Sequence, residues 1–191
     1  MENLRAIGAD GTNVNTGINN GVIRLLELHL RKPLQRLICL FHFNELPLRH
    51  LLLQLDGCAT GPNAFTGEIG KKLLHCHDMN IVNFEVRENG LPCQIQPDVR
   101  KELSKDQEYL YEICEAIKCG SVSSTLEKRE PGKLVHSRWL TAANRILRLY
   151  VSTASPSDEL LVLTDYILLV YAPIWFRIKL NPQSYQGARH V

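Results

Sequence analysis

The fold is decided by Ala6-Ile-Gly-Ala-Asp10-Gly-Thr-Asn-Val-Asn15, taken together with Leu37-Ile-Cys-Leu-Phe-His42. The first stretch predicts a short strand over 4–9, after which Asp10 opens a turn. Thr16 can cap a helix whose apolar residues share one face. The second stretch predicts a strand over 34–43, and its continuous apolar character predicts cover on both faces. Strand, helix and strand in this order predict two parallel strands with a right-handed connection.

The remainder of the chain is predicted to be mostly helical. Asn44 is expected to cap a further helix, which has Pro47 in its first turn and ends at Asp56. One more strand is expected, over 81–86. The other expected segments are a short helix at 68–74, a linker at 90–100, a helix at 104–120, a loop or short helix at 121–132, and helices at 136–151 and 157–171. The sequence therefore predicts a helix-rich α/β protein with a strand-helix-strand-helix domain over 1–56 and a mostly helical region over 57–191.

Composition is typical of a soluble intracellular protein. Of the 191 residues 45% are hydrophobic and 22% are charged, and the net charge is only +2, so a surface for nucleic acid has to be local. No apolar leader follows Met1, and the six cysteines include no Cys-x-x-Cys pair, which favours a reducing compartment. The apolar run 160–176 contains Asp165 and is shorter than the ~20 residues of a membrane span. We interpret it as a buried helix and expect no membrane association.

Asp10 is the candidate catalytic residue. A carboxylate at the carboxyl end of a buried strand stands where α/β sheets keep their ligands, and Mg²⁺ prefers such oxygen ligands. Phosphoryl transfer with two metal ions needs several converging carboxylates, and Asp10 is only one. Taken alone, the aspartate before Gly11 is better explained as a turn former.

Cys39 and His42 form a Cys-x-x-His motif at the end of the second predicted strand. A structural zinc site needs four ligands, and no second pair stands at a convincing spacing. Alternation along a strand would also place the two side chains on opposite faces, unless the strand ends between them. We therefore predict structural roles for both residues and no bound metal.

The segment 136–151 carries the candidate nucleic-acid-binding residues. Arg138, Arg145 and Arg148 are spaced so that they share one helix face, with Trp139 nearby. Guanidinium groups can neutralise phosphates, and an indole can stack on a base. The alternative, which is favoured for the helix taken alone, is a solvated basic face over a buried tryptophan.

In their order along the chain, these motifs resemble transposases of the hAT type, which have a ribonuclease-H-like catalytic core. The resemblance rests on Asp10-Gly-Thr-Asn-Val-Asn15, then Cys39-x-x-His42, then Ser137-Arg138-Trp139, and covers roughly residues 4–150. It implies that Asp10 is one catalytic carboxylate of three and that Arg138 and Trp139 lie in a helical insertion. A partial ribonuclease-H-like core followed by that insertion is the fold it implies.

The sequence departs from this family in its catalytic machinery. A strand bearing another catalytic aspartate has no counterpart before residue 4, and Glu159 is a poor candidate for the closing glutamate. We therefore expect a transposase-derived fragment without catalytic activity, which associates with nucleic acid and is nuclear if it binds DNA. Mg²⁺ at Asp10 is expected only in a complete core. The alternative is a protein-interaction or dimerisation module derived from the helical insertion, whose apolar helices dimerise or bind a partner.

The predicted sheet also implies association. Two parallel strands are fewer than a sheet needs for independent stability, and a bare strand edge can pair with another chain. The sequence therefore predicts self-association, or a partner that supplies strands.

Overall fold

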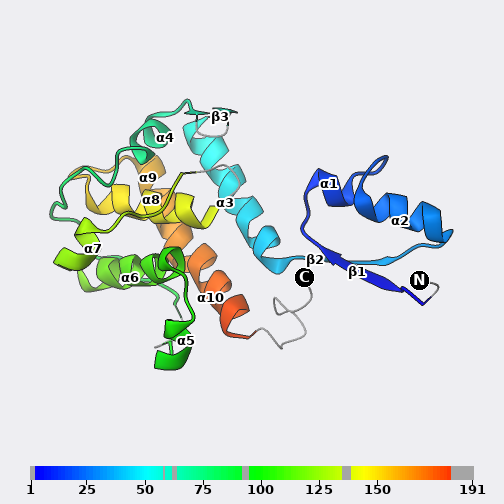
Figure 1. The fold of residues 1–191 in the computed structure, drawn as a ribbon. Coiled ribbons are helices and arrows are strands. Elements are labelled where there is room, and N and C mark those ends of the chain that lie inside the picture. The colour runs from blue at the N-terminus through cyan, green and yellow to red at the C-terminus, as the bar shows by residue number, and fades with distance from the viewer. Residues whose placement is uncertain (1–2, 58, 62–63, 92–94, 135–138, 182–191) are drawn as a thin grey trace. The chain divides into compact units, whose positions relative to one another are not determined.

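The structure, a computed structural model, describes most of the chain: residues 3–57, 59–61, 64–91, 95–134 and 139–181 (Figure 1). It divides into two compact units. Unit 1 comprises residues 1–46 and 177–191, and unit 2 comprises residues 47–176. The division falls inside the helix α3 (Leu40–Asp56), whereas the sequence predicts a domain boundary after that helix.

Unit 1 contains the predicted strand-helix-strand arrangement. Its elements before α3 are β1 (Ala6–Ala9), α1 (Asn13–Thr16), α2 (Val22–Leu30) and β2 (Gln35–Ile38). The two strands are parallel neighbours, with Ile7 opposite Arg36. Residue Arg31 ends α2 in the left-handed conformation, with φ of 53°, and Pro33 follows shortly after. The prediction of a parallel pair is confirmed.

The second predicted strand is too long. β2 ends at Ile38 and α3 begins at Leu40, so the last part of the predicted strand is helical. Asn44 is consequently a buried residue inside α3 and not its cap, and Pro47 lies in the helix interior. The reason is that a continuous apolar run is compatible with a buried strand or a buried helix, and periodicity alone does not separate them.

The strands of unit 1 are also less covered than predicted. Ala6 and Gly8 are exposed in β1, as are the first three residues of β2. Leu37, the first residue of the apolar run, retains 37% of its accessible surface. The apolar run predicts that both faces of these strands are buried. The described part of the chain does not bury them on both faces.

Unit 2 has a helical core organised around α8 (Trp139–Val151). This helix packs against α4 (Glu68–Leu73), α6 (Lys105–Cys119) and α9 (Asp158–Tyr166). The side chains between these helices include Leu110, Ile113, Ile146, Leu147 and Leu163, all fully buried. Continuous burial of apolar surface of this kind is the main favourable contribution to folding.

The predicted ends of α6 are confirmed. The Ser104 hydroxyl accepts a hydrogen bond from the backbone N–H of Gln107, and the Gln107 side chain accepts one from the Ser104 N–H. This reciprocal pair satisfies two backbone donors at the helix start. Gly120 closes the helix with φ of 75°, which glycine adopts without steric cost.

Several smaller predictions for unit 2 need correction. The expected strand over 81–86 pairs with no other strand among the described residues, but runs beside α8, with the Val82 N–H donating to the Val151 carbonyl at 3.0 Å. The expected linker contains a short helix, the short helix that was the alternative for 121–132 is present, and a small hairpin precedes α4. These elements are α5 (Pro97–Lys101), α7 (Ser124–Lys128), β3 (Ala59–Gly61) and β4 (Ala64–Phe65). Helical residues that are mostly polar carry little apolar periodicity, which explains why the pattern missed them.

The last described helix continues past its predicted end at Tyr171. After α9 come the π-helical turn η1 (Ile167–Tyr171) and α10 (Ala172–Leu180). Pro173 cannot donate to the preceding turn, and the N–H of Gly90 donates to the Leu168 carbonyl instead, at 3.0 Å. By length and composition, Asp158–Leu180 is the one helix in the described ranges that could cross a membrane, and 56% of its most apolar window is buried inside the protein.

Candidate functional site

Asp10 follows β1 directly and holds the turn that leads into α1. Its Oδ1 accepts hydrogen bonds from the Thr12 hydroxyl at 2.6 Å, the Asn15 side-chain amide at 2.7 Å and the Thr12 N–H at 3.1 Å. These bonds, led by the one from the Thr12 hydroxyl, hold the pKa of the Asp10 carboxyl below its ordinary value. The carboxylate is therefore ionised and already serves as the acceptor at the centre of a turn.

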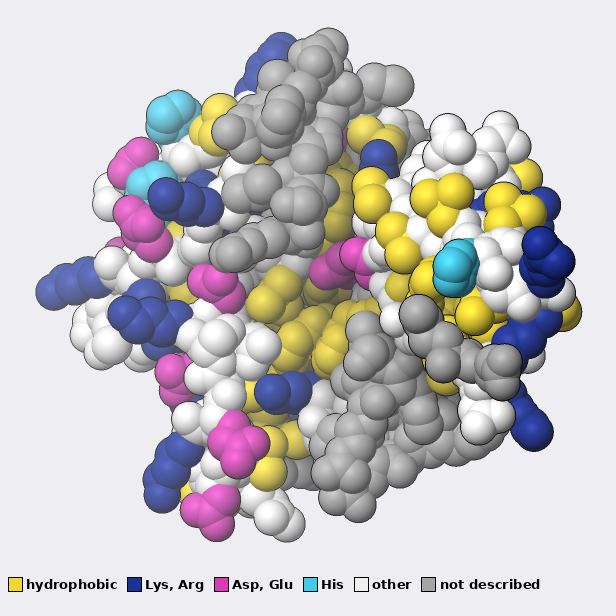
Figure 2. Space-filling view, turned by 45° about the vertical axis from the view of Figure 1, so that its right-hand side comes forward, with side chains coloured by type: hydrophobic (Ala, Val, Ile, Leu, Met, Phe, Trp, Pro, Cys, Tyr) yellow, Lys and Arg dark blue, Asp and Glu magenta, His cyan; other side chains and the backbone are white. Residues whose placement is uncertain are grey.

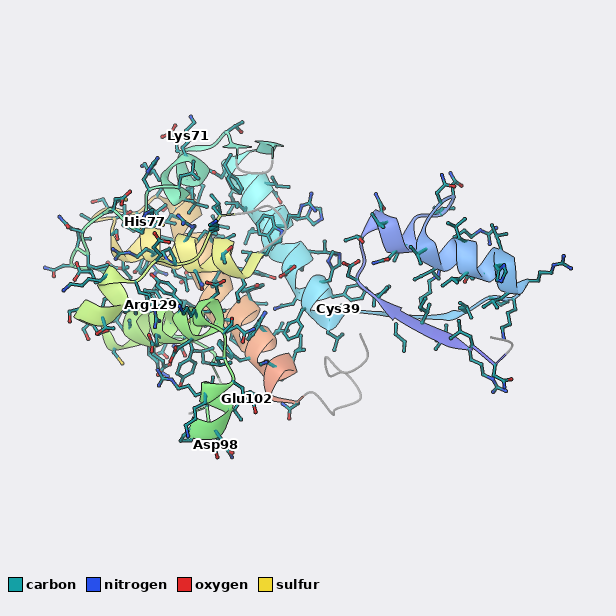
Figure 3. The ribbon with its side chains drawn as sticks, in the orientation of Figure 1. Cys39, Lys71, His77, Asp98, Glu102 and Arg129 are labelled. Carbon is teal, nitrogen blue, oxygen red and sulfur yellow. The ribbon has the colours of Figure 1, made fainter. Side chains whose placement is uncertain are left out.

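Cys39 and His42 lie on either side of the point where β2 gives way to α3 (Figure 3). The Cys39 N–H extends the strand pairing by donating to the Ala9 carbonyl at 2.9 Å. His42 packs against Gly11 so closely that a Cβ on the glycine would lie 2.6 Å from the imidazole Cδ2. The motif thus anchors the start of α3 against the Asp10 turn, with the absence of a side chain at Gly11 permitting the contact.

The described residues assemble no metal centre. No three His, Cys, Asp or Glu side chains among them are grouped as ligands of one ion would be. Of the other acids in unit 1, Glu27 is engaged by Arg36 at 3.1 Å and by the Leu34 N–H at 3.2 Å. Asp10 accordingly has hydrogen-bond donors around it in place of the further carboxylates that two-metal chemistry requires.

The predicted stripe on α8 faces the core of unit 2 and not the solvent. Arg145 and Arg148 retain 6% and 1% of their accessible surface, and Trp139 retains 5%. The prediction of an exposed basic face is therefore wrong for both arginines, whether the face was to bind phosphates or only water. Arg138 lies outside the described residues.

The buried guanidinium groups bind backbone carbonyls. Arg145 donates to Leu73 through Nη1 at 2.6 Å and to Gly132 through Nε at 2.7 Å. Arg148 donates through Nη2 to the Met79 carbonyl at 2.9 Å, and at the longer distance of 3.4 Å to the carbonyls of His77 in the same segment and Glu127 in α7. Both side chains therefore hold irregular segments against α8, a use that matches the five fixed donors of a guanidinium group.

The sequence analysis did not identify several other side chains that connect segments of unit 2. Asn144 donates to the Asp106 carbonyl at 2.9 Å, and the Tyr150 hydroxyl donates to the Glu85 carbonyl at 2.7 Å. Arg87 binds both carboxylate oxygens of Asp165 at 2.6 Å. Arg129, labelled in Figure 3, pairs with Glu112 of α6 and lies 5.3 Å from the ring centre of Tyr109. The helix itself gave no signal of its complete burial, because its polar residues share one face, as they do on a helix with a solvated side: Thr141, Asn144, Arg145 and Arg148.

A different basic surface is exposed on unit 1, along α2 and the residues that follow it. Two shallow hollows, of about 380 and 390 Å³, share Arg24 and Leu28 in their walls. The cationic side chains around them are Arg24, Arg31, Lys32 and Arg36. On the right of Figure 2, where this unit is seen, Lys and Arg side chains lie beside exposed hydrophobic ones. Glu27 is the acid within this cluster, and Arg36 binds it.

Comparisons with known proteins add no relative: no family model, no curated protein and no solved structure matches the chain.

Proposed function

We propose that the chain is a transposase-derived protein without strand-cleaving activity of its own, and that it works by associating with another protein chain through unit 1. The order of the Asp10, Cys39-x-x-His42 and Arg138-Trp139 motifs supports the derivation. The hydrogen bonds that already occupy Oδ1 of Asp10 support the lack of cleavage.

The observation that carries the association is the two-stranded sheet of unit 1. β1 and β2 pair only with each other among the described residues, and both are exposed over much of their length. A sheet reaches independent stability with about three or more strands and a hydrophobic face. The helix that connects these strands contributes one fully buried large side chain, Ile23, whereas Val22, Leu25 and Leu28 are 44–54% exposed. Another chain that covers these groups would supply the missing burial.

Sedimentation of the purified chain over a range of micromolar concentrations tests this function. We expect a mass above the 21.7 kDa of one chain, falling towards it on dilution. A monomer at every concentration, with cooperative unfolding and no retained partner, would contradict the proposal. Cleavage of a DNA duplex with Mg²⁺ that disappears in Asp10→Asn would contradict the catalytic half of it.

Nucleic-acid association through α2 is the second candidate function. The cluster of cations around the two hollows favours it, because four basic side chains around a single carboxylate are a local positive surface on a nearly neutral chain. Each phosphate contact contributes about 0.7–0.9 to the slope of log affinity against log salt concentration. Replacing Arg24 and Arg36 by glutamine should lower that slope by roughly 1.4–1.8, whereas replacing Lys71 and Lys101, which are exposed on unit 2, should not. Equal slopes in the two variants would contradict nucleic-acid binding through α2.

A further inference from the structure

The two strands of unit 1 have different outer edges, and hydrogen-bond directions identify them. The N–H of Gln35 donates to the Arg5 carbonyl and that of Cys39 to the Ala9 carbonyl, each at 2.9 Å. Polar groups of alternate residues in a strand point to opposite sides. In β1, therefore, residues 5, 7 and 9 point towards β2.

It follows that Ala6 and Gly8 direct their N–H and C=O groups to the outer edge of β1. Both residues are exposed. The same alternation in β2 turns Arg36 and Ile38 to its outer edge. Each strand therefore presents two residues whose backbone groups can pair with a further strand.

The outer edge of β1 lacks the features that normally prevent pairing. All four residues of this strand, from Ala6 to Ala9, are uncharged, and none is proline. The outer edge of β2 carries Arg36, whose guanidinium is held at 3.1 Å by Glu27. Charged side chains and prolines protect edges against pairing, so β1 has the unprotected edge and β2 the protected one.

We infer that the β1 edge pairs with the β1 edge of a second copy of this chain, antiparallel and about a two-fold axis. This inference rests on the proposed function and names its partner and its surface. Two-fold symmetry brings the same surface of both copies together, which suits an edge that is neutral along its whole length. The product is a four-stranded sheet in the order β2, β1, β1, β2, above the size at which sheets become independently stable.

Alternation and the length of the strand together select the register. Ala6 and Gly8 are the only outward-facing residues of β1, and both are paired within the strand only when Ala6 lies across from Gly8 of the second copy and Ile7 lies across from Ile7. The two isoleucines form the close, non-hydrogen-bonded pair, with Cα atoms about 4.5 Å apart. At the ends, Arg5 lies across from Ala9 and Asp10 across from Leu4, so no two like charges face each other.

Cysteine cross-linking tests this register without disturbing the strands. In Ile7→Cys, oxidation should give a disulfide-linked dimer, because the expected Cα separation lies within the range that a disulfide spans. Arg36→Cys, on the other outer edge, is the matched control and should form no more linked dimer than the wild-type chain. The inference is overturned if Ile7→Cys links no better than the wild type, or if Arg36→Cys links as readily.

Proline substitution tests the hydrogen bonds. Ala6→Pro removes an outward N–H and leaves the bonds to β2 in place, whereas Ala6→Val keeps the N–H. We expect light scattering to show that Ala6→Pro raises the dissociation constant roughly tenfold or more and that Ala6→Val does not. Association of Ala6→Pro at wild-type strength would overturn the β1 inference and leave the proposed function standing. A monomeric wild type would overturn both.

Discussion

The central helix of unit 2, α8, is buried along its described length, whereas the longest helix before α3 in unit 1, α2, is half exposed. In α8 every described side chain from Thr141 to Val151 is buried, and even the two arginines reach backbone acceptors. In α2 three large apolar side chains are about half exposed, and the adjoining strands are open to solvent. The comparison teaches that one chain can bury a helix completely in one unit and leave the apolar side chains of a helix in the other unit half exposed.

The difference follows from the number of layers in each unit. Around α8, helices on several sides remove its apolar surface from water. The β1–β2 sheet has two short strands, connected by the short helices α1 and α2, so it has little surface against which to bury a face. The proposed association through unit 1 rests on this difference in exposure.

Matched leucine truncations give the largest expected contrast between the units. Leu147→Ala in α8 removes a fully buried side chain and should lower the free energy of unfolding by roughly 2–5 kcal/mol. Leu25→Ala in α2 removes a side chain that is 52% exposed and should cost about 1 kcal/mol or less in the dissociated chain. Urea denaturation followed by circular dichroism measures both. Equal losses would show that the two helices are buried alike.

Matched arginine substitutions give a smaller contrast. Arg148→Met leaves the carbonyls of His77, Met79 and Glu127 without this donor and should destabilise unit 2 by roughly 1–3 kcal/mol. Arg36→Met, which removes a half-exposed ion pair, should cost about 0–1 kcal/mol.

Burial of the Arg148 side chain also has an energetic cost, which acts against its hydrogen bonds. Among the described residues its Nε and Nη1 are buried without a hydrogen-bond partner, which is itself unfavourable. A neutral or stabilising Arg148→Met would mean that this cost exceeds the value of the bonds made by Nη2.

The Asp10 turn gives the smallest effect. Because the folded-state pKa of this carboxyl is lowered from 3.8, its contribution to stability is present above that pH and is lost as the pH falls through the folded-state value. Thr12→Val removes the hydroxyl that is the largest cause of the lowering, so the pKa should rise towards 3.8. An NMR titration of the Asp10 carboxyl measures this. An unchanged midpoint would show that the hydroxyl does not bind the ionised form.

Local chemistry in the sequence was sufficient for some elements. The capping box at Ser104 and the stop at Gly120 place α6 within a residue, because caps are read from neighbouring side chains. The order of strand, helix and strand likewise predicts the parallel pairing of β1 with β2. The prediction of a strand was wrong for the second half of the run from Leu37 to His42, which belongs to α3. A continuous apolar run shows neither the period of a strand nor that of a helix, so the sequence does not distinguish them.

The candidate site was harder to predict because it depends on tertiary contacts. Helical spacing correctly groups Arg145 with Arg148, but it cannot say whether that face meets water or loops from elsewhere in the chain. The loops that contact it come from residues 73–79 and 127–132, far away in sequence. Asp10 was placed correctly at the end of its strand, and its hydrogen-bond partners, Thr12 and Asn15, are close enough in sequence for a turn to have been expected.

Hydrogen exchange of the intact chain at two concentrations, one below and one above the onset of association, tests the central claim most directly. We predict that amides in α6 and α8 are equally protected at both concentrations, because unit 2 completes its own core. The outward amides of Ala6 and Gly8 should gain protection only at the higher concentration. Full protection of these two amides in the dissociated chain would contradict the claim that unit 1 depends on another chain.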